Sequence, residues 1–165
     1  MEEKENCCFG LKALKKEYEK LKLKYSLPSF KEINEDFDIE KLQEKESELL
    51  IREVRRAMIE KNLIYLRFVE MFMSPSTAPM FFLVLVRGLN SEEKKLLEEL
   101  YTKLGRREIK SIYLDNEYNE RKEAEFIKKF YKEWQEIKSK FGSVLRAVEE
   151  GWERKSERKE KGYLG

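Results

Sequence analysis

The 16 residues Met71–Val86 (MFMSPSTAPMFFLVLV) contain no charged side chain, and this run limits the possible folds more than any other part of the sequence. Charged residues make up 41% of the whole sequence, so the run contrasts sharply with its surroundings. Met, Phe and Leu side chains gain free energy when they leave water. The run must therefore be covered by the rest of the domain, by another chain or by a membrane.

A membrane span is the least favoured of these three covers. A helix needs about 20 apolar residues to cross a bilayer, which is more than this run offers. Pro75 and Pro79, with hydroxyl residues between them, also interrupt it. We interpret the run as two apolar helical segments joined by a turn. Two readings stay open, a buried core or a surface for a protein partner. The candidate interaction residues are Met71, Phe72, Met73, Met80, Phe81 and Phe82.

The composition predicts an all-α fold. Only three prolines and seven glycines interrupt 165 residues, and Glu, Lys, Leu and Arg are good helix formers. The length suits one domain. We expect a single bundle of about five to seven helices over residues 1–165, with frayed tails at 1–9 and 153–165. Two long helices are expected to pack antiparallel, one from about Glu40 to Met73 and one that carries Trp134.

Apolar spacing and capping residues predict the helix ends. A seam at alternating spacings of three and four indicates a helix that ends before Pro28. It consists of Leu11, Leu14, Tyr18, Leu21 and Tyr25. Ser29 and Glu32 match a capping box for a short second helix. Asp38 is predicted to cap the long helix that begins near Glu40.

The second half of the chain is read in the same way. Met80–Val86 is predicted to form a helix closed by Gly88. Ser91 is expected to cap the next helix and Gly105 to end it, before a weaker helical or extended piece. The last long helix begins near Glu120, after a turn. Its apolar seam consists of Ile127, Phe130, Trp134, Ile137, Phe141, Val144 and Val148.

Basic clusters suggest a second class of function. The net charge is only +2, so the chain as a whole does not attract nucleic acid, and any binding must use a local patch. The candidate nucleic-acid residues are Arg52, Arg55, Arg56, Arg106, Arg107 and Lys110. Nearby glutamates dilute each cluster.

Catalytic chemistry has few candidate residues. The chain has no His, which removes the usual general base and transition-metal ligand. Cys7 and Cys8 are adjacent and form neither an ordinary disulfide nor a CxxC motif. Two carboxylate groups are able to bind Mg²⁺ or Ca²⁺ through oxygen, so a carboxylate-metal enzyme is a distant alternative. They are Asp36, Asp38 and Glu40, and Asp115, Glu117 and Glu120. We assign no catalytic, metal or cofactor residue and expect no cofactor.

The N-terminal sequence and the composition indicate a setting for the protein. The first residues are acidic and lack an apolar core, so we expect no signal peptide and a cytoplasmic location. Abundant Lys and Glu, with two Cys and no His, are typical of hyperthermophile proteins.

Three segments resemble a family of small helical proteins from archaea and related uncultured prokaryotes. The segments are YSLPSFKEINEDFDIEK, LLIREVRRAMIEKN and RKEAEFIKKFYKEWQEIK. The resemblance covers most of the chain after Tyr25, implies an α-helical fold and carries no activity or site residue. The segment LNSEEKKLLEELYTKL also resembles the helical domain of archaeal replication-complex subunits of the GINS type. That family normally adds a small β-domain, for which this sequence has no pattern.

These observations favour an interaction or scaffolding module that self-associates, with a homodimer expected. The alternative is a nucleic-acid-associated accessory protein that uses local basic patches. The sequence indicates no membrane partner and no small-molecule substrate.

Overall fold

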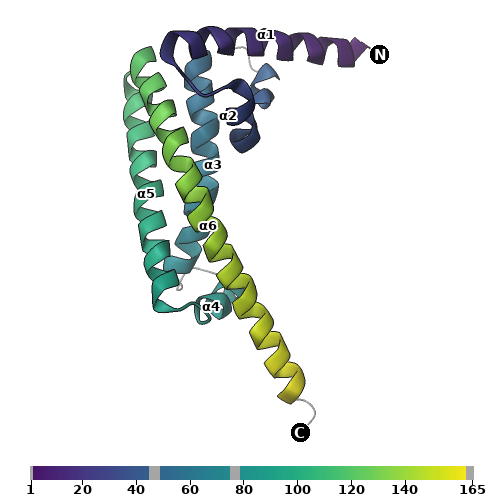
Figure 1. The fold of residues 1–165 in the computed structure, drawn as a ribbon, viewed down its shortest axis with the longest axis vertical. Coiled ribbons are helices and arrows are strands. Elements are labelled where there is room, and N and C mark those ends of the chain that lie inside the picture. Colours follow the sequence, from purple (N-terminus) through teal and green to yellow (C-terminus); the bar gives the residue numbers. More distant parts are fainter. Residues whose placement is uncertain (1, 45–48, 75–78, 163–165) are drawn as a thin grey trace. The chain divides into compact units, whose positions relative to one another are not determined.

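The computed structural model describes residues 2–44, 49–74 and 79–162. Within these ranges the chain forms six α-helices, one 3₁₀ helix and no strand, which confirms the all-α class (Figure 1). The elements are α1 (Glu2–Tyr25), α2 (Phe30–Phe37), η1 (Ile39–Glu44), α3 (Leu50–Met73), α4 (Met80–Val86), α5 (Ser91–Asn116) and α6 (Glu120–Gly162).

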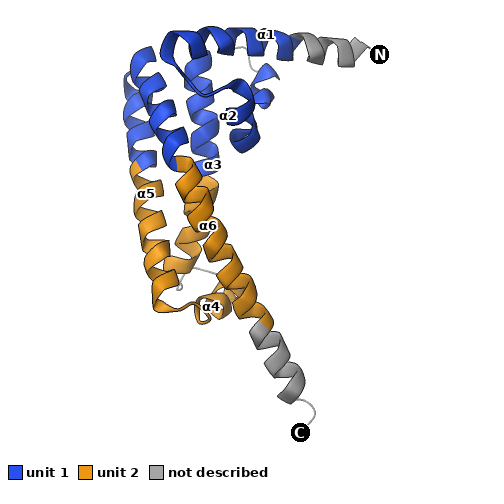
Figure 2. Ribbon diagram, in the orientation of Figure 1, with its two compact units in different colours: residues 1–62, 107–133 blue, residues 63–106, 134–165 orange. Residues whose placement is uncertain are grey.

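The chain divides into two compact units (Figure 2). Unit 1 contains residues 1–62 and 107–133, and unit 2 contains residues 63–106 and 134–165. The helices α3, α5 and α6 each contribute to both units, because the boundaries fall inside them. The expectation of one domain stays a prediction. The expected frayed tails fall on residues whose side chains lie largely outside the described part of the chain.

In unit 1, the predicted seam of α1 packs on the segment that follows it. Leu14 and Tyr18 are buried, and the ring of Tyr18 meets Phe30 edge-on with 5.6 Å between centroids. The Tyr18 hydroxyl donates a hydrogen bond to the carbonyl of Pro28 at 2.9 Å. The Ser29 and Glu32 capping box is present at the start of α2. The sequence therefore predicted both the seam and this cap correctly.

The prediction that a long helix begins near Glu40 is wrong. Asp38 does not start a helix but ends α2, in a left-handed conformation (φ 53°, ψ 41°) with its N–H bonded to the Asn34 carbonyl. Residues 39–44 form the 3₁₀ helix η1, and α3 begins only at Leu50. Ile39 and Leu42 are both buried, and three residues per turn place them on the same side of η1.

The predicted limits of α5 are also corrected. Asn90, not Ser91, is the cap, because its Oδ1 accepts hydrogen bonds from the backbone N–H groups of Glu92 and Glu93, each at 2.9 Å. The helix continues through Gly105 to Asn116. Leu104 and Ser111 are buried on one face of the continuous helix. Burial of this face outweighs the roughly 1 kcal/mol that a glycine costs inside a helix.

The final helix follows its prediction closely. It begins at Glu120, and Asn119 caps it by accepting a hydrogen bond from the backbone N–H of Lys122 at 3.0 Å. Six members of the predicted seam are buried, two in unit 1 and four in unit 2. They are Ile127, Phe130, Trp134, Ile137, Phe141 and Val144. Gly142 does not interrupt the helix.

In unit 2, the long antiparallel pair is α5 with α6. Ion pairs join Lys103 to Glu136 at 2.7 Å and Glu99 to Lys140 at 2.8 Å, so residue numbers fall along one helix as they rise along the other.

The predicted antiparallel pairing is wrong for the helix that ends at Met73 and the helix that carries Trp134. In unit 2, Tyr65 contacts Trp134 and Phe68 contacts Phe141, so residue numbers rise together along α3 and α6. Within unit 2 these two helices therefore run in the same direction.

Candidate functional site

The uncharged run Met71–Val86 is divided between the core and the surface of unit 2. Residues 71–73 end α3, Met80–Val86 forms α4, and residues 75–78 lie outside the described part. No helix among the described residues is long and apolar enough to cross a membrane. Phe72 is buried, and its ring meets the half-buried Phe82 edge-on at 5.4 Å. Met71 is also half-buried. The run thus contributes part of its side chains to the core.

The other part of the run is exposed. Met73, at the end of α3, is exposed, and Met80 and Phe81 on α4 keep 74% and 53% of their area in contact with solvent. The Phe81 ring contacts Trp152 of α6, with 5.2 Å between centroids, and Trp152 is itself 46% exposed. We call Met80, Phe81 and Trp152 the α4 surface. Trp152 is not among the interaction residues predicted from the sequence.

Two glycines hold α4 close to α6. A Cβ atom added to Gly88 would lie 3.3 Å from the carbonyl oxygen of Leu85 and 3.6 Å from the Cα of Gly151. Leu85 and Leu89, on either side of Gly88, are buried. The carboxyl end of α4 is therefore anchored backbone to backbone, and Met80 and Phe81 lie at its amino end.

Charged residues of both signs lie near the residues of the α4 surface in the sequence. Arg87 directly follows α4, and Arg146 lies on the same helix as Trp152. Glu149 and Glu150 are also on α6, within one turn of Trp152, and all four of these charged residues are exposed. The segments of unit 2 that carry the α4 surface therefore also expose charges of both signs.

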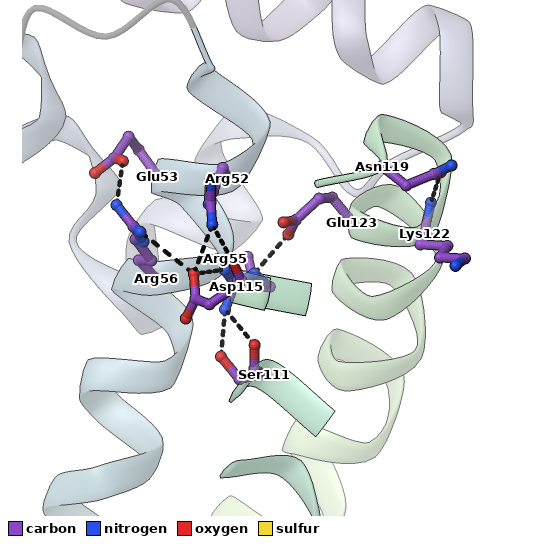
Figure 3. A network of polar contacts seen from close by, with 9 residues as sticks. All are labelled: Arg52, Glu53, Arg55, Arg56, Ser111, Asp115, Asn119, Lys122 and Glu123. Carbon is purple, nitrogen blue, oxygen red and sulfur yellow. Dashed lines mark hydrogen bonds and ion pairs between the residues drawn. The ribbon is translucent and has the colours of Figure 1, made fainter. Parts of the chain in front are cut away.

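In unit 1, three of the predicted nucleic-acid residues belong to a polar network (Figure 3). Arg55 is fully buried, and its Nε donates to Glu123 Oε2 at 2.5 Å. Its Nη1 donates to the Ser111 hydroxyl, and its Nη2 donates to Asp115 Oδ1 at 2.6 Å. One guanidinium therefore connects α3, α5 and α6, which is a structural role.

The other two arginines of this cluster also reach Asp115. Arg52 Nη2 donates to the Asp115 carbonyl at 2.7 Å, and Arg56 Nη2 lies 3.3 Å from Asp115 Oδ1. Burial acts to raise the pKa of Asp115, but the hydrogen bonds and charges of the arginines outweigh it and lower this pKa. Burial raises the pKa of Glu123, although the charge of Arg55 acts in the opposite direction.

The second basic cluster has one paired and two unpaired members among the described residues. Arg107 is buried, with Nη2 donating to Glu133 at 2.9 Å and its guanidinium 4.7 Å from the centre of the Phe130 ring. Arg106 and Lys110 are exposed and make no ion pair with any described residue. Four of the six candidate residues therefore pair with carboxylates of the chain itself, namely Arg52, Arg55, Arg56 and Arg107.

The carboxylate groups proposed for metal binding are also engaged. Asp115 binds the arginines, Glu120 pairs with Lys24 at 3.2 Å, and Glu40 accepts a hydrogen bond from the Asn34 side chain. Among the described residues, no group of three or more His, Cys, Asp or Glu is placed to hold a metal ion. The side chains of Cys7 and Cys8 lie outside the described part.

Comparisons with protein-family models, with curated proteins and with solved structures give no match for this chain.

Proposed function

We propose that this chain is a protein–protein interaction or scaffolding module that self-associates as a homodimer through the α4 surface. The observation that carries the proposal is the exposure of Met80 and Phe81 beside the exposed Trp152. Met and aromatic side chains are enriched in interfaces, and clustered exposed apolar residues mark interaction sites. Covering them in a dimer removes apolar area from water, which favours association.

The balance of exposed charges in unit 2 supports a second copy as the partner. A two-fold interface brings one patch against itself, so that patch must be complementary to its own copy. Arg87 and Arg146 lie on the same unit as Glu149 and Glu150, which supplies both signs for reciprocal pairs. The net charge of +2 adds little repulsion between copies.

The test is the oligomeric state of charge-bearing variants. We expect the wild-type chain to be a dimer at micromolar concentration in light scattering, and Phe81→Glu and Trp152→Glu to be monomers, because a buried unpaired carboxylate strongly opposes association. Ile64→Glu is the matched control, since Ile64 is also exposed and lies in unit 2 on α3. Circular dichroism checks that each variant remains helical. A wild-type monomer, or a control that dissociates equally, would contradict the proposal.

We also propose a cytoplasmic setting in a thermophilic archaeal cell. The acidic N-terminus, the Lys- and Glu-rich composition and the resemblance to small archaeal helical proteins support it. The arginines that meet at Asp115 and the Lys140 side chain, which pairs with both Glu99 and Glu136, are ion-pair networks of the kind that favours stability at high temperature.

A further inference from the structure

A second apolar surface lies on α5 within unit 1. Ile109, Ile112 and Tyr113 are 57%, 53% and 71% exposed. Their spacings of three and four residues place them along one side of the helix, at about 100° per residue. Arg107 and Ser111, on the opposite side of α5, are buried in unit 1. None of the three exposed residues is among the interaction residues predicted from the sequence. We call Ile109, Ile112 and Tyr113 the α5 face.

A cationic side chain borders the α5 face. Lys110 is exposed and forms no ion pair with any described residue, whereas the neighbouring Arg107 pairs with Glu133. On a helical wheel Lys110 falls roughly 60° from Tyr113, so it lies at one edge of the apolar side rather than inside it. A partner with a negative charge at that edge would satisfy Lys110.

We propose that the α5 face docks an amphipathic helix of a different protein, one that carries Glu or Asp at the edge facing Lys110. Apolar residues at helical spacing match the seam of a partner helix, and charges at the flanking positions select the partner and its direction. This proposal adds a different protein as a partner to the proposed scaffolding function and rests on that function. Binding at the α5 face does not require self-association through the α4 surface, because the two surfaces share no residue.

Two other occupants fit this face less well. In an antiparallel pair of α5 helices whose two-fold axis passes near Lys110, Lys110 of each copy would meet Lys110 of the other, and like charges repel. Single-stranded nucleic acid binds by stacking bases on aromatic rings along a positive groove. The α5 face offers two aliphatic isoleucines and one tyrosine instead.

The experiment uses the full-length chain and two synthetic helical peptides. Both peptides carry leucine at heptad positions a and d. One has glutamate at the flanking e and g positions and the other has lysine, so each repels its own copies. Fluorescence anisotropy of labelled peptide measures binding to the wild type, Ile109→Asp, Lys110→Glu and the control Leu23→Asp. Leu23 is an exposed apolar residue of unit 1 on α1.

We expect the glutamate peptide to bind the wild type and Leu23→Asp equally. Ile109→Asp should weaken binding at least about tenfold, which corresponds to roughly 1.4 kcal/mol. Lys110→Glu should lower the affinity for the glutamate peptide and raise the affinity for the lysine peptide. Each change should be about two- to fivefold, as for an exposed ion pair.

Three results would overturn the inference. These are failure of both peptides to bind the wild type, equal losses in Ile109→Asp and Leu23→Asp, and no change of peptide preference in Lys110→Glu. Light scattering of Ile109→Asp separates this inference from the proposed function. If Ile109→Asp remains a dimer but no longer binds the peptide, the result supports both this inference and the proposed function. If Ile109→Asp becomes a monomer, the α5 face instead binds a second copy of the chain. Binding of a mixed-sequence RNA that Ile109→Asp abolishes would assign the face to nucleic acid.

Discussion

Arg55 shows how strongly one residue can depend on its partners. It is fully buried between the carboxylates of Glu123 and Asp115. A buried charge is tolerated only when it is paired and hydrogen-bonded, and removal of one partner leaves the other uncompensated.

Arg55→Met should therefore lower the free energy of unfolding by about 3–5 kcal/mol. The double variant Arg55→Met, Glu123→Leu should recover much of this loss, because it removes both charges. Arg56→Met is the matched control and should cost no more than about 1 kcal/mol, since Arg56 is 46% exposed. Urea denaturation measures all three. Equal losses for Arg55 and Arg56 would show that burial of the pair does not matter.

Tyr18 supplies a pH-dependent prediction. Burial, with the charges of Glu19 and Glu32, raises the pKa of Tyr18 in the folded state. A tyrosine whose folded pKa is raised contributes stability that is complete below its unfolded pKa of about 10 and is lost as pH rises above it.

Tyr18→Phe should cost about 1 kcal/mol at neutral pH, because the Pro28 carbonyl loses the hydroxyl that donates to it. The variant should also lose less stability than the wild type between about pH 9 and pH 11. Thermal melts across this range test both effects. Parallel curves for the two proteins would show that the hydroxyl does not titrate with unfolding.

At the scale of the element, α5 contains a glycine that its helix does not need. A Cβ atom added to Gly105 meets nothing within 4 Å, although Gly105 lies well inside the helix. Gly88 is different, because an added Cβ there would lie 3.3 Å from the Leu85 carbonyl oxygen and close to Gly151.

Gly105→Ala should raise the free energy of unfolding by about 1 kcal/mol, since alanine favours the helix and restricts the unfolded chain. Gly88→Ala should instead destabilise the protein, because the close backbone contact must open. Chemical denaturation of the two variants provides the comparison. A loss of stability in Gly105→Ala would mean that its surroundings are more crowded than the open space around Gly105 indicates.

At the scale of the whole molecule, the ion pairs favour stability at high temperature. Because the hydration of charged groups becomes less favourable on heating, networks stabilise more at high temperature than at 25 °C. We expect the full chain to melt above about 90 °C in differential scanning calorimetry. A melting temperature in the mesophilic range of about 45–65 °C would contradict the proposed thermophilic setting.

Only some residues of the α4 surface could be predicted from the sequence. The uncharged run predicted Met80 and Phe81 as interaction residues, because so many neighbouring apolar side chains need a cover, either the rest of the domain or a partner. The same reasoning included Phe72, which is buried, and left out Trp152, which lies far away in the sequence and contacts Phe81. Periodicity shows which residues share a face of a helix, but it does not show which neighbouring helix covers that face.

Four features follow from the amino-acid sequence alone: the all-α class, the capping box at Ser29, the short helix α4 and the beginning of α6 at Glu120. These features depend on local propensity and on hydrogen bonds within a few residues. Tertiary structure decided that α5 passes through Gly105, that α3 and α6 run in the same direction and that Arg55 is buried. Each of these depends on contacts between segments far apart in the chain, such as Arg55 with Glu123, whose packing and charge pairing no local pattern contains.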